Sequence, residues 1–155
     1  MPSAGDTAIA LPSSGVHANG FSLVRKIIEV SKTDLATTVD GMAEPLGTML
    51  IQPTRIYHKA ARAARMAGGV TGVCHVTGGG LVENPPRVYG EDLALELDCS
   101  SWSLPPLFEW LAKAGNIAPL ELARTFNCGI GMLLFVDEGC ACLLYTSDAA
   151  DEGVR

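Results

Sequence analysis

The sequence has few aromatic residues, no long hydrophobic run and no surplus of positive charge. Aromatic residues make up 6% of the 155 positions, and apolar stretches such as Met132 to Val136 are far too short to span a bilayer. The 11 Lys and Arg residues are scattered and outnumbered by 17 Asp and Glu, which gives a net charge of −6. A nucleic-acid-binding surface needs a basic stripe. We therefore expect neither a membrane nor a nucleic acid as a partner.

The cysteines lack the spacing of a zinc site. They are five in number, and only Cys140 and Cys142 lie close together in the sequence. The first ten residues lack the charged and apolar regions of an export signal. We expect a cytoplasmic location, reduced thiols and no metal site formed by this chain. Cys74 and Cys128 fit small buried apolar residues better than nucleophiles, because neither lies in a nucleophile motif.

The length and the apolar content predict a single compact domain with its own core. At 155 residues, of which 48% are hydrophobic, the chain can bury most of such a core. Apolar periodicity predicts about four strands and four to five helices. Strands are expected at 7–11, 73–77, 93–98 and 130–136, and helices at 20–30, 45–51, 56–66, 105–115 and 120–126. Because the two types do not alternate cleanly, the predicted class is a layered α+β fold with a mixed sheet.

The end of the sequence differs from the rest. Cys142 to Glu152 reads CLLYTSDAADE, shows no periodicity, and resembles the translation of an adaptor used to build sequencing libraries. We expect residues 1–141 to form the domain and residues 142–155 to be a non-native tail. The alternative is an ordinary flexible acidic terminus. In either case this segment is expected to carry no function.

The segment LPSSGVHANG, from Leu11 to Gly20, joins a predicted strand to a predicted helix. A helix start offers free N–H groups and a partial positive charge, which favour a phosphate. Ser13, Ser14 and Asn19 can add hydrogen bonds to such a ligand. Spacing alone nevertheless favours a capped turn, in which these side chains satisfy backbone donors and His17 is merely packed.

Two further segments are rich in glycine. HVTGGGLVENPPR, His75 to Arg87, follows a predicted strand, and its three glycines let a backbone approach a ligand closely. It fits neither the Walker pattern nor the dinucleotide fingerprint, so a ligand loop and a tight turn remain equally good interpretations. RTFNCGIGM, Arg124 to Met132, is best interpreted as an ordinary turn between a helix and a strand.

Six segments in one order carry a resemblance to a known family. They are GD, LPSSGVHANGFSLVRK, PTRIY, HVTGGGLVENPPRV, SSW and RTFNCGIGM. Together they resemble the carboxy-terminal domain of the phosphoribosylformylglycinamidine cyclo-ligases, also called aminoimidazole ribonucleotide synthetases, from Gly5 to about Val136. Ala18 stands where the family usually has Ser, and Pro85 where it usually has Ile. The alternatives are another synthetase or kinase of the same superfamily, or a non-catalytic module for ligand binding or dimerisation.

The resemblance implies a cytoplasmic, homodimeric, two-domain ligase that uses ATP and magnesium. In that family ATP phosphorylates a formyl oxygen, a ring nitrogen attacks the same carbon, and phosphate departs as the imidazole ring closes. The resemblance assigns the binding of the ribonucleotide substrate to Ser13, Ser14, Gly15, Asn19, Thr77, Gly78, Gly79, Gly80 and Asn84. His17 is expected to transfer or orient a proton. ATP and magnesium would bind mainly through an amino-terminal domain absent from this sequence, so a piece cut at both ends is expected to be inactive alone.

Overall fold

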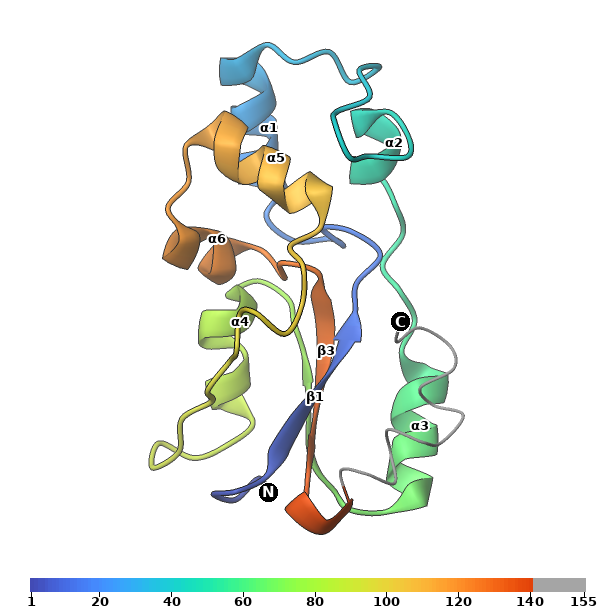
Figure 1. Cartoon of the computed structure of the whole chain (residues 1–155), viewed down its shortest axis with the longest axis vertical. Helices are drawn as coiled ribbons and strands as arrows, with labels where there is room; N and C mark the ends of the chain where they lie inside the picture. The colour runs from blue at the N-terminus through green and yellow to red at the C-terminus, as the bar shows by residue number, and fades with distance from the viewer. Residues whose placement is uncertain (141–155) are drawn as a thin grey trace.

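The computed structural model describes residues 1–140, and the predicted non-native tail at 142–155 lies outside the described residues. Figure 1 shows helices on both sides of a small central sheet. The elements in chain order are β1 (Thr7–Pro12), α1 (Phe21–Ser31), α2 (Leu46–Leu50), α3 (His58–Ala67), β2 (Val70–His75), α4 (Gly80–Glu83), η1 (Pro85–Arg87), α5 (Pro106–Gly115), α6 (Pro119–Thr125), β3 (Ile130–Val136) and η2 (Glu138–Cys140).

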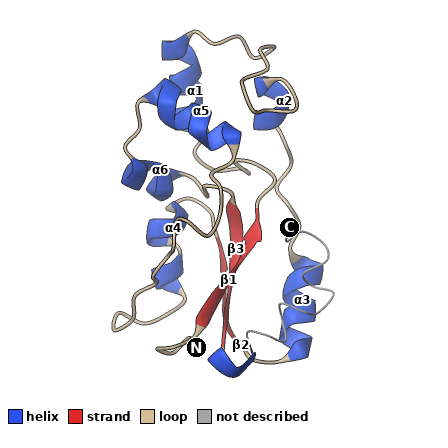
Figure 2. Ribbon diagram, viewed as in Figure 1, coloured by secondary structure: helices blue, strands red, loops and turns tan. Residues whose placement is uncertain are grey.

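The sheet has three strands in the order β1-β3-β2, and both outer strands run antiparallel to β3 (Figure 2). Every residue of β3 is buried, because this strand is central and covered on both faces. Successive side chains of a strand point to opposite faces. Met132 and Leu134 accordingly pack into one hydrophobic cluster, whereas Leu133 and Phe135 pack into another.

Helix α3 covers one face of the sheet and contributes mainly alanine to the contact. Ala64 is buried there, and Ala60 and Ala61 pack against the same cluster. Small side chains let a helix approach a sheet closely, so the layer of side chains between α3 and the sheet is thin. The opposite face carries the larger core, in which α1 and α5 pack together through residues such as Ile27 and Leu111.

The sequence predicted the fold class but not the whole sheet. The predicted α+β class and the limits of β3 are confirmed. The predicted mixed sheet is wrong, because both strand pairs formed by residues 1–140 are antiparallel. The fourth strand, predicted at 93–98, is also wrong. Leu93, Leu95 and Leu97 are half-buried and alternate with exposed neighbours, but the segment is an extended loop that lies on the core without strand pairing. The alternation of apolar and polar residues in this segment therefore reflects the burial of one of its sides and does not indicate pairing with another strand.

The predicted glycine turn also contains an unexpected helix. β2 ends at His75, and after Thr77 and Gly78 the chain forms the single turn of α4 from Gly80 to Glu83.

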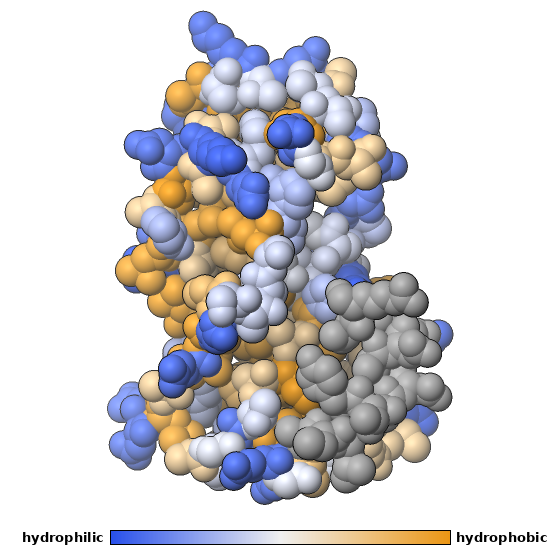
Figure 3. Space-filling model, in the orientation of Figure 1, coloured by the Kyte–Doolittle hydropathy of each residue, from blue (hydrophilic) through white to orange (hydrophobic). Residues whose placement is uncertain are grey.

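Within the described residues, no helix is both long enough and apolar enough to cross a membrane. Hydrophilic residues gather over the helical end at the top of Figure 3, and hydrophobic ones over the middle, near α6 and α4.

Candidate functional site

The ends of β1 and β2 and the start of β3 lie at the same edge of the sheet, because the outer strands are antiparallel to the central one. In the ladder, Pro12 pairs with Ile130, and His75 pairs with Met132. Three loops continue from these strand ends: residues 13–20, 76–79 and 126–129. We call this region the loop end of the sheet. The three buried polar side chains of the described chain, His17, Asn84 and Asn127, all belong to it.

Asn127 fixes the first loop to the start of β3. Its Oδ1 accepts hydrogen bonds from the Ser13 hydroxyl at 2.9 Å and from the Gly129 N–H at 2.9 Å. Its Nδ2 donates to the Gly15 carbonyl at 2.8 Å. The Ser14 hydroxyl separately donates to the Pro53 carbonyl at 2.6 Å. The loop is therefore held on both sides before it reaches His17.

His17 is buried in a left-handed backbone conformation, with φ of 58° and 4% of its surface exposed. The backbone N–H of Ser14 donates to His17 Nε2 at 3.2 Å, so this nitrogen is the acceptor. Burial lowers the pKa of the imidazole below its ordinary value of 6.5, and nearby His75 lowers it further. The ring is therefore neutral at pH 7 and carries its proton on Nδ1. No described residue accepts a hydrogen bond from Nδ1.

Two aromatic rings flank this imidazole. The Tyr57 ring centroid lies 6.2 Å from that of His17, and the His75 centroid lies 6.4 Å from it. Tyr57 and His75 also meet edge to face at 5.9 Å. Tyr57 is buried, whereas His75 is exposed. His17 is thus enclosed by a ring from the start of α3 and by a ring from the end of β2.

The second loop is organised by Asn84. Its Oδ1 accepts hydrogen bonds from the Thr77 N–H and from the Thr77 hydroxyl, and its Nδ2 donates to the Gly78 carbonyl at 2.8 Å. Both the oxygen and the nitrogen of the Asn84 amide are engaged in these contacts, so Asn84 fixes the shape of the loop. Gly80, with φ of 55°, lies directly against the carbonyl oxygens of Ala123 and Phe126, leaving no room for a side chain.

The two loops are neighbours. The Asn19 Oδ1 lies 3.9 Å from the position that a Cβ on Gly78 would occupy. Gly20, which precedes α1, fits against the ring of Phe126, where a Cβ would overlap that ring. All predicted site residues therefore gather at the loop end, from Ser13 to Asn19 on one loop and from Thr77 to Asn84 on the other. Their roles toward a ligand remain predictions.

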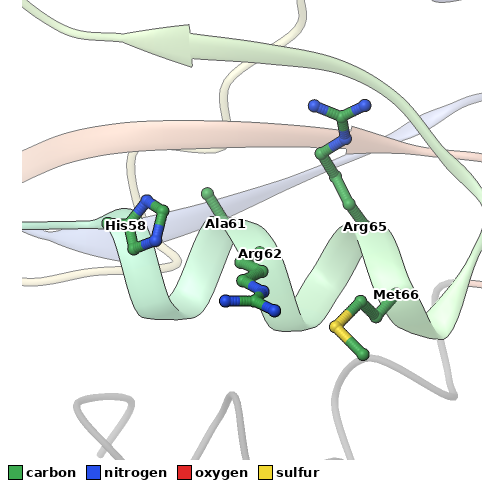
Figure 4. Close-up of a pocket in the computed structure, with 5 residues that line it drawn as sticks. All are labelled: His58, Ala61, Arg62, Arg65 and Met66. Atoms are coloured by element: carbon green, nitrogen blue, oxygen red, sulfur yellow. The ribbon is translucent and has the colours of Figure 1, made fainter.

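A separate pocket lies along α3, away from these loops. Figure 4 shows that its lining side chains come from this one helix. They are His58, Ala61, Arg62, Arg65 and Met66. The described residues contain no group of three His, Cys, Asp or Glu side chains that could hold a metal ion.

A family model described as AIR synthase related protein, C-terminal domain, matches residues 3–152. The chain belongs to this family. The curated relatives of the chain are consistent with this family assignment. The chain is 49% identical over 134 residues to a protein named phosphoribosylformylglycinamidine cyclo-ligase from Aromatoleum aromaticum, covering 85% of this chain and 38% of the relative.

Proteins of the same name from two other organisms are equally similar. The one from Burkholderia vietnamiensis is 53% identical over 133 residues, covering 86% of this chain and 37% of the relative. The one from Paraburkholderia xenovorans is 53% identical over 132 residues, covering 85% of this chain and 37% of the relative. The chain therefore spans little more than a third of the length of these curated relatives.

Sequence reasoning missed three parts of this AIR synthase related domain. Asn127 was assigned to an ordinary turn, although its side chain joins two loops. Tyr57 was not singled out, because a Tyr before a helix has no local signature. Gly131 lies in the same segment that the sequence predicts as an ordinary turn, and the structure shows that a Cβ there would overlap the Tyr57 hydroxyl. A glycine inside a strand of large residues is the signal that could have indicated such a close approach.

Proposed function

We propose that the chain forms the substrate-side domain of a phosphoribosylformylglycinamidine cyclo-ligase, an ATP-dependent enzyme that closes the imidazole ring of aminoimidazole ribonucleotide in purine biosynthesis. The ribonucleotide would bind at the loop end. The observation that carries this proposal is the meeting of the two glycine-rich loops, where Asn19 lies beside Gly78 and the first loop also contains the buried His17.

The chemistry of the loop end suits a sugar phosphate. No side chain caps α1, since Gly20 precedes it. The Leu23 and Val24 N–H groups donate to the Gly20 carbonyl, and the N–H groups of Phe21 and Ser22 would be the ones offered to an anion. Asn19 adds an amide that could donate to the ligand. The Ser13 and Ser14 hydroxyls already donate their protons to Asn127 and to the Pro53 carbonyl, so toward a ligand they would accept hydrogen bonds from sugar hydroxyls, with Gly15 between them and the buried Val16. From the other loop, Thr77 and residues 78–80 would face the same ligand, with Asn84 holding their shape.

His17 would act as a hydrogen-bond donor. Its Nε2 already accepts the Ser14 N–H, so Nδ1 is the ring nitrogen left for a ligand, and it carries the proton when the ring is neutral. Nδ1 is buried in this structure, so the neighbouring loops would have to move for a ligand to reach it. Such a group can donate to an oxygen of the substrate and orient it, or pass on a proton. The positioning of a substrate against the reacting partner accounts for much of the rate in reactions of this type.

The complete reaction is a proposal about the whole protein, because the chain spans only 38% of the Aromatoleum relative. ATP and magnesium, an amino-terminal domain, a homodimer and a cytoplasmic location belong to this wider proposal. An extended segment after α2 supports a contact with another domain or subunit. Its residues Ile51 and Ile56 are 77% and 85% exposed, so both offer apolar surface to such a contact.

Calorimetric titration tests the proposed site directly. Formylglycinamidine ribonucleotide and ATP are titrated separately into the chain and into two variants. Asn19→Ala removes an amide at the meeting point of the loops, and Arg62→Ala removes a cation from the pocket on α3. We expect binding of the ribonucleotide to the unmodified chain, and about fivefold weaker binding to Asn19→Ala, the equivalent of one hydrogen bond.

The Arg62→Ala variant should bind as tightly as the unmodified chain. The opposite pattern, in which Arg62→Ala loses the ribonucleotide and Asn19→Ala keeps it, would move the phosphate site to α3 and overturn the proposal. Preference for ATP over the ribonucleotide would also count against a substrate-side domain. A ring-closure assay with ATP should show no turnover by this chain alone.

A further inference from the structure

We propose that Tyr57 is a positioning residue for His17, and that its ring and hydroxyl, fitted over Gly131, hold the imidazole in one orientation with the proton on Nδ1. This inference rests on the proposed function, because it concerns the same site. It adds a residue from the start of α3 to a site otherwise made of loops.

The Tyr57 hydroxyl acts through the end of β1. It donates a hydrogen bond to the Pro12 carbonyl at 2.8 Å. The ladder between β1 and β3 shifts its register between Leu11 and Pro12, so this carbonyl stands where regular strand pairing stops. Two residues later, the Ser14 N–H donates to His17 Nε2. The hydroxyl thus fixes the segment that selects the tautomer of the imidazole.

Gly131 provides the space that this arrangement needs. A Cβ on Gly131 would overlap the Tyr57 hydroxyl and would lie 2.8 Å from His17 Cε1. The carbonyl of Gly131 meanwhile accepts the Val76 N–H at 2.9 Å, so the backbone here cannot withdraw easily. Tyr57 and His17 therefore occupy the surface of β3 together, in a volume that one added methyl group would fill.

The hydroxyl keeps its proton throughout the physiological range. Burial raises the pKa of Tyr57 to about 12, although the Arg55 guanidinium lowers it in part. A neutral phenol can donate to Pro12 at every pH at which the protein would work. The contact is consequently a permanent part of the site and does not respond to pH.

Tyr57 also belongs to the cluster beneath α3, so a loss of stability alone would not distinguish positioning from packing. The distinguishing measurement is the state of His17. Long-range proton–nitrogen correlation spectra of the ligand-free chain report which imidazole nitrogen carries the proton, and a pH series gives the midpoint of titration. Tyr57→Phe keeps the ring and removes only the hydroxyl. Tyr89→Phe is the matched control, because Tyr89 packs on Phe135 in the other cluster.

In the unmodified chain and in Tyr89→Phe, we expect a single tautomer with Nδ1 protonated and a midpoint below 6.5. In Tyr57→Phe, we expect both tautomers, because the Pro12 carbonyl is no longer held and the Ser14 N–H is less well fixed on Nε2. The midpoint should stay below 6.5, since the remaining ring keeps the imidazole buried. Gly131→Ala should have the same effect, because its methyl group must displace the Tyr57 ring.

Three results would overturn the inference. The first is Nε2 protonation or mixed tautomers in the unmodified chain, which needs no variant to fold. The second is a His17 spectrum that Tyr57→Phe leaves unchanged, with or without a lower unfolding temperature. The third is an equal change in Tyr89→Phe. The spectra are recorded without ligand, so they test the role of Tyr57 independently of the titrations that test ribonucleotide binding. Either proposal can therefore be overturned while the other stands.

Discussion

The two ends of the sheet are built differently. At the loop end, His17, Asn84 and Asn127 are buried and hydrogen-bonded to loop backbone. At the opposite end, polar contacts stay nearer the surface, as in the hydrogen bond from Thr71 to Asp6 at 2.6 Å. Burying a polar group costs free energy unless partners compensate for it. The concentration of such groups at one end therefore identifies the part of the domain whose shape is most tightly specified.

The largest effect is expected from Gly80→Ala. The added methyl group would collide with the Ala123 carbonyl, and a φ of 55° disfavours any side chain, so we expect a loss of about 3 kcal/mol or more in unfolding free energy. Gly90→Ala is the control, because its Cβ would meet nothing within 4 Å. Urea unfolding measures both. Equal costs in the two variants would mean that the loop end is no more tightly specified than an ordinary surface loop.

Removal of a buried amide should have the next largest effect. Asn84→Ala leaves the Thr77 N–H and the Gly78 carbonyl without their partner, and we expect a loss of about 2 to 3 kcal/mol. Thr71→Val at the opposite end removes a half-buried hydrogen bond and should cost about 1 kcal/mol or less. The difference between the two variants measures the contrast between the ends. A larger loss for Thr71→Val would reverse it.

The sequence predicted the elements of the fold better than their pairing. The apolar run of β3 and the helical spacing of α1 are local signals, and both elements appear where they were expected. The segment 93–98 alternates equally well, yet it lies on the core as a loop, because alternation records burial of one side and not a partner strand. Strand pairing depends on residues far apart in the chain, such as Thr7 and Val136, which no local pattern connects.

The same limit applies to the site. Glycines and small polar residues at predicted strand ends indicated the two loops, and both loops do lie at one edge of the sheet. The contacts that fix them were not predictable from spacing. Asn127 is separated from Ser13 by 114 positions, and Tyr57 from Pro12 by 45, so each bond exists only after the fold has formed. Local motifs therefore located the loops, whereas tertiary contacts determine the orientation of His17.

A smaller effect should appear in the pH dependence of stability. Because the pKa of His17 is lowered in the folded state, the unfolded chain binds the proton more readily. Stability should therefore be unaffected by His17 above pH 6.5 and fall as the pH drops below it, by at most about 1.4 kcal/mol per pH unit. His17→Gln should flatten the profile between pH 7 and pH 5. The same flattening in His58→Gln, which alters an exposed residue of α3, would argue against a special role for the loop end.

The smallest effect tests whether position at the loop end is enough to make a residue important to stability. Arg124 of α6 lies 3.5 Å from Glu83 and 3.5 Å from Glu121, but it is 46% exposed. Ion pairs in contact with water contribute little, so Arg124→Gln should change the unfolding free energy by less than about 0.5 kcal/mol. Lys26→Gln, which breaks an exposed pair at 3.0 Å on α1, should give a similar value. If Arg124→Gln instead cost as much as Asn84→Ala, charge at the rim would matter as much as buried hydrogen bonds, and the contrast between the two ends of the sheet could not be attributed to burial.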